Sequence, residues 1–329
     1  MFKNWLFLIL AIFLSIFFCE LVVRVRYSYK APWYEQLITQ QREAERRQYR
    51  LNKWGLRDRD FEASKPSGCR RILILGDSFT YGAGVDNESD VFPKLLEKML
   101  NQKIDMPGVE KIEVLNGGIG GSLTNHWVDL LIKIEDHFQP DVVLVVFFLR
   151  DGTLITSVQD FFNPIRNDIA ERNRESILYR YLYIYRLIKD YIDRMLVANK
   201  YTQKINQSYL GDKKQTVEWE KAKSNILKIE QCGNKRSAVT GLVVFPILAE
   251  LNASYPFRAV CNTIMEFAVK NNIPAHSLLP AFMGLNGKDL WVSPYNQHPN
   301  EKAHLIAAQS MLPFTQDLLR KAERKRLGK

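Results

Sequence analysis

The stretch RRILILGDSFTYGAGV, residues 70–85, runs from a continuous apolar segment into a Gly-Asp-Ser turn and then into glycine-rich sequence. A short, unbroken apolar run of this kind is typical of a buried parallel strand. Two interpretations fit the turn. Gly76, Asp77 and Ser78 are ordinary turn formers that end a strand, or Ser78 is a nucleophile at the carboxyl end of a parallel strand, where open α/β sheets bind their ligands.

The apolar pattern of this first segment recurs downstream. It is repeated in KIEVLNGGIGG (111–121), PDVVLVVFFLRDG (140–152) and GLVVFPIL (241–248). A helical pattern, VFPKLLEKML, lies between the first and second of the four segments, and another, HWVDLLIKIEDHF, lies between the second and third. Apolar strands that alternate with helices indicate a parallel sheet with helices on both faces. The sequence therefore predicts an α/β fold, a three-layer sandwich around a parallel, flavodoxin-like sheet.

Polar turns follow the first three of these strands, and parallel strands bring such turns to one edge of the sheet. Ser78, the glycines at 117, 118, 120 and 121, and the LRDGT turn at 149–153 are expected at that edge. A fourth segment, WVSPYNQHPNEKAHLIAAQSMLPF (291–314), places His298 in a loop just before a helix, with Pro299 expected in the first helical turn. His298 is therefore a candidate base.

These four segments, in this order, resemble the blocks of the SGNH, or GDSL-like, hydrolase superfamily: Gly-Asp-Ser after the first strand, Asn-x-Gly-x-x-Gly, a turn that ends in Asn-Asp, and a final His-Pro-Asn. The likeness covers residues 70 to about 155 and 240 to 318. The resemblance implies acyl transfer, with Ser78 as nucleophile and His298 as general base. It also implies an oxyanion hole made by the backbone N–H groups of Ser78 and Gly121 and by the side chain of Arg150.

Two positions depart from the family pattern. Arg150 stands where most of the family has asparagine, and its guanidinium could donate to an oxyanion or turn away to pair with Asp151 or a substrate carboxylate. The acid that usually lies three residues before the histidine is absent, because Tyr295 is there and Asn296 follows. Either Asp289 serves as a displaced third catalytic residue, or a backbone carbonyl near Tyr295 orients the histidine in a Ser-His dyad, which we favour, or the protein is inactive.

The N-terminal sequence WLFLILAIFLSIFFCELVV, Trp5 to Val23, is apolar and long enough to cross a bilayer as a helix. No small-x-small cleavage site follows it, so we expect it to be retained. The predicted organisation is a membrane anchor at 1–24, a juxtamembrane linker at 25–69, and an SGNH hydrolase-like domain at 70–329 with a helical insertion at about 152–238.

Two features of the sequence predict opposite orientations of the N-terminal segment in the membrane. The basic residues Arg24, Arg26 and Lys30 favour a cytoplasmic C-terminal side. The anchor and the stretch NKWGLRDRDF (52–61), however, resemble bacterial proteins of this superfamily that are linked to acylated surface polysaccharides. We therefore expect a single-pass protein of the bacterial inner membrane, with its catalytic domain in the periplasm or outside the cell.

The insertion contains ESILYRYLYIYRLIKDYIDRML (175–196), which interleaves tyrosine, aliphatic and basic residues at helical spacing. This pattern fits an amphipathic helix packed on the core, a lid, a carbohydrate-binding wall or a membrane-surface helix. The polar stretch NQSYLGDKKQTVEWEKAKSN (206–225) that follows is expected to be mobile.

Composition narrows the possible partners. The net charge of +10 is moderate and the four cysteines have no zinc-like spacing, so we expect no nucleic acid, metal or cofactor. The sequence predicts a serine-dependent ester hydrolase that removes an acyl group from a surface polysaccharide or other glycan. The alternatives are an O-acetyltransferase of such a polysaccharide, a catalytically inactive glycan-binding module, and a lipid esterase at the bilayer surface.

Overall fold

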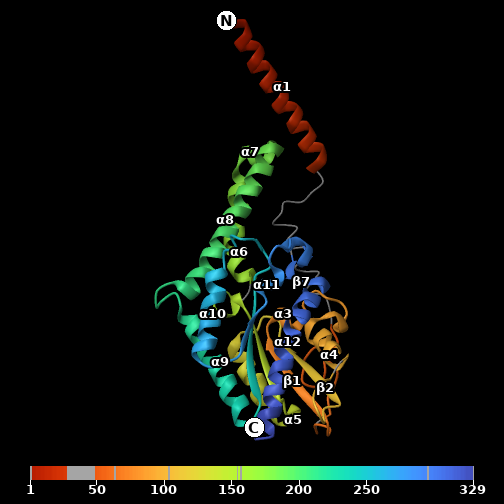
Figure 1. The fold of residues 1–329 in the computed structure, drawn as a ribbon. Coiled ribbons are helices and arrows are strands. Elements are labelled where there is room, and N and C mark those ends of the chain that lie inside the picture. Colours follow the sequence, from red (N-terminus) through yellow and green to blue (C-terminus); the bar gives the residue numbers. More distant parts are fainter. Residues whose placement is uncertain are drawn as a thin grey trace. The chain divides into compact units, whose positions relative to one another are not determined.

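The computed structural model of the chain describes residues 2–27, 49–62, 64–102, 104–153, 155, 158–294 and 296–328 (Figure 1). The chain divides into two compact units. The first, here called the helical unit, contains residues 1–42 and 157–201. The second, the sheet unit, contains residues 43–156 and 202–329, and it holds all the candidate catalytic residues.

A parallel sheet of five strands in the order β2-β1-β3-β4-β5 forms the centre of the sheet unit. Its strands are β1 (Cys69–Gly76), β2 (Lys111–Gly118), β3 (Val142–Phe148), β4 (Val239–Phe245) and β5 (Ala275–Ser277). The four strands predicted from apolar runs are confirmed, and so is the flavodoxin-like order. The short β5 was not predicted, because Ala-His-Ser is not an apolar run.

Helices cover both faces of this sheet, and aromatic contacts show which helices share a face. On one face, α4 (Phe92–Gln102) and α12 (Glu301–Arg326) meet where Phe92 packs against Phe245 of β4 and His304. On the other face, Phe147 of β3 packs between Trp127 and Trp219, which lie on α5 (Thr124–Phe138) and α9 (Val217–Lys235). A third helix, α10 (Arg258–Lys270), joins α9 there. The strands are apolar throughout because both faces are buried.

Short elements follow the strand ends. They are α3 (Ser78–Tyr81), η1 (Glu88–Asp90), η2 (Leu149–Gly152), α11 (Leu279–Phe282), η3 (Gly287–Leu290), and the antiparallel pair β6 (Trp291–Ser293) and β7 (Asn296–Pro299). The expectation for Pro299 is wrong in detail. Pro299 is the last residue of β7, so it lies before the helix. Asn300 caps α12, because its side-chain oxygen accepts the N–H of Ala303, which has no acceptor within the helix.

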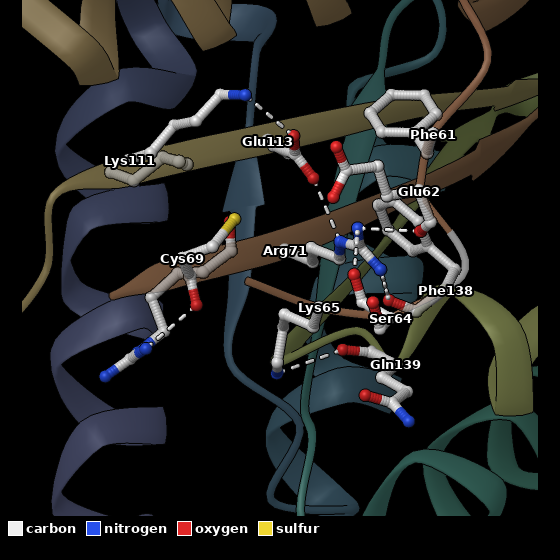
Figure 2. Close-up of polar contacts among 12 residues, drawn as sticks. Phe61, Glu62, Ser64, Lys65, Cys69, Arg71, Lys111, Glu113, Phe138 and Gln139 are labelled. Carbon is white, nitrogen blue, oxygen red and sulfur yellow. Dashed lines mark hydrogen bonds and ion pairs between the residues drawn. The ribbon is translucent and has the colours of Figure 1, made fainter. Parts of the chain in front are cut away.

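The opposite end of the sheet is held by Arg71, whose side chain on β1 is fully buried (Figure 2). Its guanidinium pairs with Glu113 of β2 at 2.9 Å and donates to the carbonyl oxygens of Phe138 and Glu62. Lys111 pairs with the other oxygen of Glu113. Because a buried charge is tolerated only when it is paired and hydrogen-bonded, this cluster fixes β1, β2 and the end of α5 together, far from the carboxyl ends of the strands.

The predicted linker at 25–69 lies partly outside the described residues, which omit 28–48 and 63. Residues 25–27 are the end of α1 in the helical unit, and the described part from residue 49 belongs to the sheet unit. The guanidinium of Arg57, only 1% exposed, donates to the carbonyl oxygens of Gly82 and Val85 beyond α3. The buried carboxylate of Asp58 accepts from Lys94 and from the backbone N–H of Asn116. This segment therefore braces the loop beyond α3 and the last part of β2.

The helical unit contains α1 (Phe2–Tyr27), α6 (Val158–Glu175), α7 (Ile177–Tyr181) and most of α8 (Tyr183–Leu210). The helix expected over 175–196 is broken at Leu182. The expectation of a mobile segment at 206–225 is wrong for most of its length, because α8 continues to Leu210 and α9 begins at Val217. Trp219 and Ile226 of α9 are buried, so this helix is the crossover between β3 and β4.

Among the described residues, α1 is the one helix long and apolar enough to cross a membrane. The segment Asn4–Arg26 has 23 residues and a mean hydropathy of 2.9, and none of it is buried in the protein. These properties suit a membrane span and a signal sequence alike.

Candidate active site

The Gly-Asp-Ser turn links β1 to α3 at the carboxyl edge of the sheet. Asp77 caps α3, and its Oδ1 accepts the N–H of Phe79 at 2.9 Å. Ser78 is the first residue of the helix and is 9% exposed. The turn lies so close to the end of β2 that a Cβ at Gly118 would stand 2.2 Å from the backbone nitrogen of Tyr81. Glycine at 118 is what allows this approach.

His298 lies next to Ser78, although the two residues are far apart in sequence. Nε2 of His298 is 2.9 Å from Oγ of Ser78, which is hydrogen-bond distance. The β6–β7 pair carries the histidine, and Asn300 holds this pair by donating to the carbonyl oxygens of Asp289 and Trp291. The ring of His298 packs edge-on against Phe79, with ring centroids 5.6 Å apart. The structure thus brings together the serine and histidine singled out from the sequence.

Asn296 contacts the other nitrogen of the imidazole. Its Oδ1 lies 2.6 Å from Nδ1 of His298 and also accepts the backbone N–H of His298 at 3.3 Å. A backbone N–H can only donate, so the oxygen of the amide faces this side. Nδ1 then carries the proton, and Nε2 presents its lone pair to Ser78 Oγ, which is the tautomer that a general base requires.

Of the two orienting groups expected from the sequence, Asp289 makes no side-chain contact with His298 in the described part of the chain. Asp289 is exposed in η3, and its described contact with the hairpin is made by its backbone carbonyl rather than its carboxylate. Tyr295 lies outside the described residues. Side chains two apart in a strand point to the same side, so Asn296 and His298 of β7 share a face. The spacing of two residues could have identified Asn296 from the sequence. The family pattern instead places the orienting group three residues before the histidine, and so Asn296 was missed.

Arg150 turns toward acids, the second of the two orientations expected from the sequence. Its Nη2 lies 3.0 Å from Oδ2 of Asp77 and 3.7 Å from Oδ1 of Asp151, and all three side chains are buried. Burial raises the pKa of Asp77. Burial raises the pKa of Asp151 as well, and the negative charge of Asp77 raises it further, well above the ordinary value of an aspartate. One guanidinium therefore faces two buried carboxyl groups, and the pKa of Asp151 is the more strongly raised of the two.

Replacing Arg150 with methionine is expected to destabilise the fold by about 3 kcal/mol, because Asp77 would keep a buried charge without its cation. Urea unfolding at neutral pH measures this loss. Arg150→Lys is the matched control, since it keeps the charge and should lose clearly less. A methionine variant within about 0.5 kcal/mol of the parent, the range of a neutral surface change, would contradict the pairing.

The two backbone donors expected at an oxyanion hole lie in the loops after β1 and β2. Within the described residues, neither the N–H of Ser78 nor that of Gly121 has an acceptor. Gly121 is exposed and has φ of +73°, a conformation that favours glycine. Its loop is tied to β1 by the N–H of Ile119, which donates to the carbonyl of Gly76 at 3.0 Å. Both N–H groups are therefore candidate donors to a ligand oxygen.

The surroundings of His298 disfavour its charged form. Desolvation and the positive charge of Arg150 lower the pKa of His298 from 6.5 to about 4. The imidazole is consequently neutral at pH 7 and able to accept a proton.

This lowered pKa predicts how the ester cleavage implied by the sequence resemblance depends on pH. A general base works only when neutral, so kcat/KM for ester cleavage should stay level as the pH falls from 7 to about 5 and should decline below about 4, as His298 becomes protonated. A pH–rate profile with an acid-stable ester measures this decline at low pH, the acid limb of the profile. A limb near 6.5, the ordinary value of histidine, would contradict the desolvation inferred here.

No cluster of three or more His, Cys, Asp or Glu side chains suited to a metal ion occurs in the described part of the chain. The groups at the site are a hydroxyl, an imidazole, an amide, backbone donors and a buried ion pair. This set is suited to nucleophilic acyl transfer.

The sheet order and the polar loops at its carboxyl edge place the chain among α/β proteins of flavodoxin-like topology. A family model described as GDSL-like lipase/acylhydrolase matches residues 72–311. The chain belongs to this family. None of the curated protein sequences compared with the chain matches it.

Solved structures of several esterases are similar to the chain. A lipase/acylhydrolase from Enterococcus faecalis is 16% identical, with a TM-score of 0.41 over 75% of this chain and 96% of that one. An acetylxylan esterase from Geobacillus stearothermophilus is 14% identical, with a TM-score of 0.43 over 77% and 95%. The acetyl xylan esterase AlAXEase is 17% identical, with a TM-score of 0.42 over 74% and 98%. Likenesses at this level bear on neither substrate nor mechanism.

Proposed function

We propose that this protein is a serine esterase in which Ser78, His298 and Asn296 form a catalytic triad with an amide in the place of the usual acid. The observation that carries the proposal is the continuous chain of contacts from Ser78 Oγ to His298 Nε2, 2.9 Å, and from His298 Nδ1 to Asn296 Oδ1, 2.6 Å. Membership of a family of lipases and acylhydrolases supports ester cleavage as the reaction.

The reaction follows from the protonation states at the site. His298 Nε2 takes the proton of Ser78 as Oγ attacks the ester carbonyl carbon, and the carbonyl oxygen becomes an oxyanion. The tetrahedral species collapses when the imidazolium gives its proton to the leaving alcohol, which leaves the acyl group on Ser78. Water then attacks the acyl group by the same proton route and releases the carboxylic acid.

The proposed oxyanion donors are the backbone N–H groups of Ser78 and Gly121. For Arg150 we propose a positioning role in place of the donor role implied by the family pattern. Its nitrogen is within 3.0 Å of the carboxylate that caps α3, so the guanidinium holds the helix turn on which the nucleophile sits. Its positive charge also helps to keep His298 neutral.

The proposed substrate is an acyl ester on a cell-surface polysaccharide or other glycan. Support comes from the likeness of the anchor and of NKWGLRDRDF to bacterial proteins linked to acylated surface polysaccharides, and from α1, whose length suits a membrane span. The proposed location is the bacterial inner membrane, with the sheet unit in the periplasm or outside the cell. A C-terminal reporter that is active only in the periplasm tests this orientation.

The test of function is acid release from an acylated glycan by the purified full-length protein in detergent. Free acetate formed from an acetylated polysaccharide supports the esterase. Acetyl groups that move to a second, unacetylated glycan without free acetate would instead establish an O-acetyltransferase. A protein that yields neither product and does not react with a fluorophosphonate probe would be a binding module.

A further inference from the structure

The helix α8 of the helical unit buries its polar side chains. Asp193, whose side chain is 1% exposed, accepts from Asn173 Nδ2 of α6 at 3.3 Å and pairs with Lys189. One turn earlier, Oδ1 of Asp190 accepts the hydroxyl of Tyr179 on α7 at 2.6 Å. Hydrogen bonds and an ion pair therefore hold this face of α8 against its neighbours, together with the buried side chain of Val197.

The other face of α8 is apolar and exposed. We call it the α8 stripe; its side chains are between 41% and 59% exposed, and its residues are Leu187, Ile188, Tyr191, Ile192, Met195 and Leu196. These residues recur as adjacent pairs every four positions, so they line one side of the helix. A helix in water buries its apolar face and exposes its polar one. In this part of α8 the apolar stripe is exposed while Asp193 is buried, which indicates an apolar surrounding for the stripe.

The start of α8 is attached to α1 within the same unit. The carboxylate of Glu20 accepts the backbone N–H groups of Tyr183, at 2.8 Å, and Ile184, at 2.9 Å. These are donors at the first turn of a helix, which have no partner inside that helix. Arg24 donates to the carbonyl of Tyr181 at 2.7 Å and pairs with Glu20 at 3.1 Å. The α8 stripe therefore begins next to the last turns of α1, where a spanning helix would leave the bilayer.

Charge on this part of the chain also fits a membrane surface. Residues 172–200 carry seven basic and three acidic side chains, and Asp190 and Asp193, two of the acids, are turned onto α6 and α7. Arginine and lysine extend their charged ends toward lipid headgroups, and tyrosine favours the boundary between headgroups and acyl chains. An exposed apolar stripe with basic and tyrosine neighbours is the pattern of a helix that lies in the plane of an anionic bilayer surface.

We propose that the α8 stripe lies in the headgroup–acyl boundary of the bilayer leaflet through which α1 leaves the membrane. The inference rests on the proposed span of α1 and not on esterase activity. Its consequence is that the protein is held at the membrane by two contacts, a spanning helix and a surface helix joined to it through Glu20 and Arg24. The helical unit then acts as a base fixed to the bilayer surface rather than as a lid or a carbohydrate-binding wall.

Site-directed spin labelling of the full-length protein in nanodiscs of phosphatidylcholine and phosphatidylglycerol tests the proposal. In a Cys19→Ser, Cys232→Ser background, labels at Ile188→Cys and Met195→Cys report on the stripe. Lys200→Cys, an exposed polar position on the same helix beyond the end of the stripe, is the matched control, and Phe13→Cys reports on α1. We expect the ratio of oxygen to nickel-chelate accessibility at 188 and 195 to exceed that at 200 by about threefold or more, as for side chains in acyl chains.

Other outcomes separate the two proposals. Ratios at 188 and 195 equal to that at 200, with Phe13→Cys in lipid, would leave the anchor intact and overturn the surface contact. Low accessibility to both reagents with spin–spin broadening at 188 and 195 would show a second copy of the chain on the stripe, which also overturns it. Water accessibility at Phe13→Cys would overturn the span of α1 and the inference together.

Discussion

Ester cleavage by a Ser78→Ala variant is expected to fall by about a million-fold in kcat, close to the uncatalysed rate. Without Oγ there is no acyl-enzyme, and His298 Nε2 loses the hydroxyl that lies 2.9 Å away. Losses of this size follow removal of the nucleophile from other serine triads, because the members act as a unit. Hydrolysis of 4-nitrophenyl acetate and covalent labelling with a fluorophosphonate measure the two consequences.

Ser89→Ala is the matched control for this variant. Ser89 is an exposed serine in η1 with no role in the proposed site, so its replacement should leave both rate and labelling unchanged. Residual activity of Ser78→Ala above about one-tenth of the parent, or labelling that persists in it, would place the nucleophile elsewhere. An unchanged thermal transition of both variants shows that the fold is intact.

The carboxyl edge of the sheet could be predicted from sequence because its signals are local. The apolar runs of β1 to β4 identify buried strands, parallel strands align their ends, and the loops after them must then meet. Ser78 and the glycines of the second loop follow from this reasoning alone. His298 was a candidate base from its place before a helix, but its pairing with Ser78 required the family pattern, because nothing near it in the sequence indicates that β7 returns to the end of β1.

The contacts that complete the site could not be predicted in this way because they depend on packing between distant segments. Arg57 lies in a stretch that reads as a polar linker, yet its guanidinium is buried and holds the loop beyond α3. A charged residue gives no sequence signal for burial, since only its partners make burial favourable. Arg150 is similar: the sequence allowed two orientations, and it did not indicate that Nη2 lies 3.0 Å from the capping carboxylate of Asp77.

Asn296→Ala is expected to lower kcat/KM by about a hundredfold, equivalent to about 2.7 kcal/mol of barrier. The methyl group cannot accept the Nδ1 proton, so the imidazole is no longer held with its Nε2 lone pair toward Ser78. A wrong tautomer or ring orientation accounts for large losses in other triads when the orienting group is changed. Gln297→Ala, an exposed neighbour on the opposite face of β7, should retain full activity.

Two further variants decide which group orients His298. Asn296→Asp places a carboxylate at Nδ1, which stabilises the imidazolium and should raise the pKa of His298 above about 4, so the acid limb of kcat/KM moves to higher pH while the rate is kept. Asp289→Asn should change the rate less than about twofold, or 0.4 kcal/mol, because the carboxylate is exposed and the hairpin contact uses the backbone carbonyl. A hundredfold loss in Asp289→Asn together with an active Asn296→Ala would transfer the third catalytic position from the amide to Asp289.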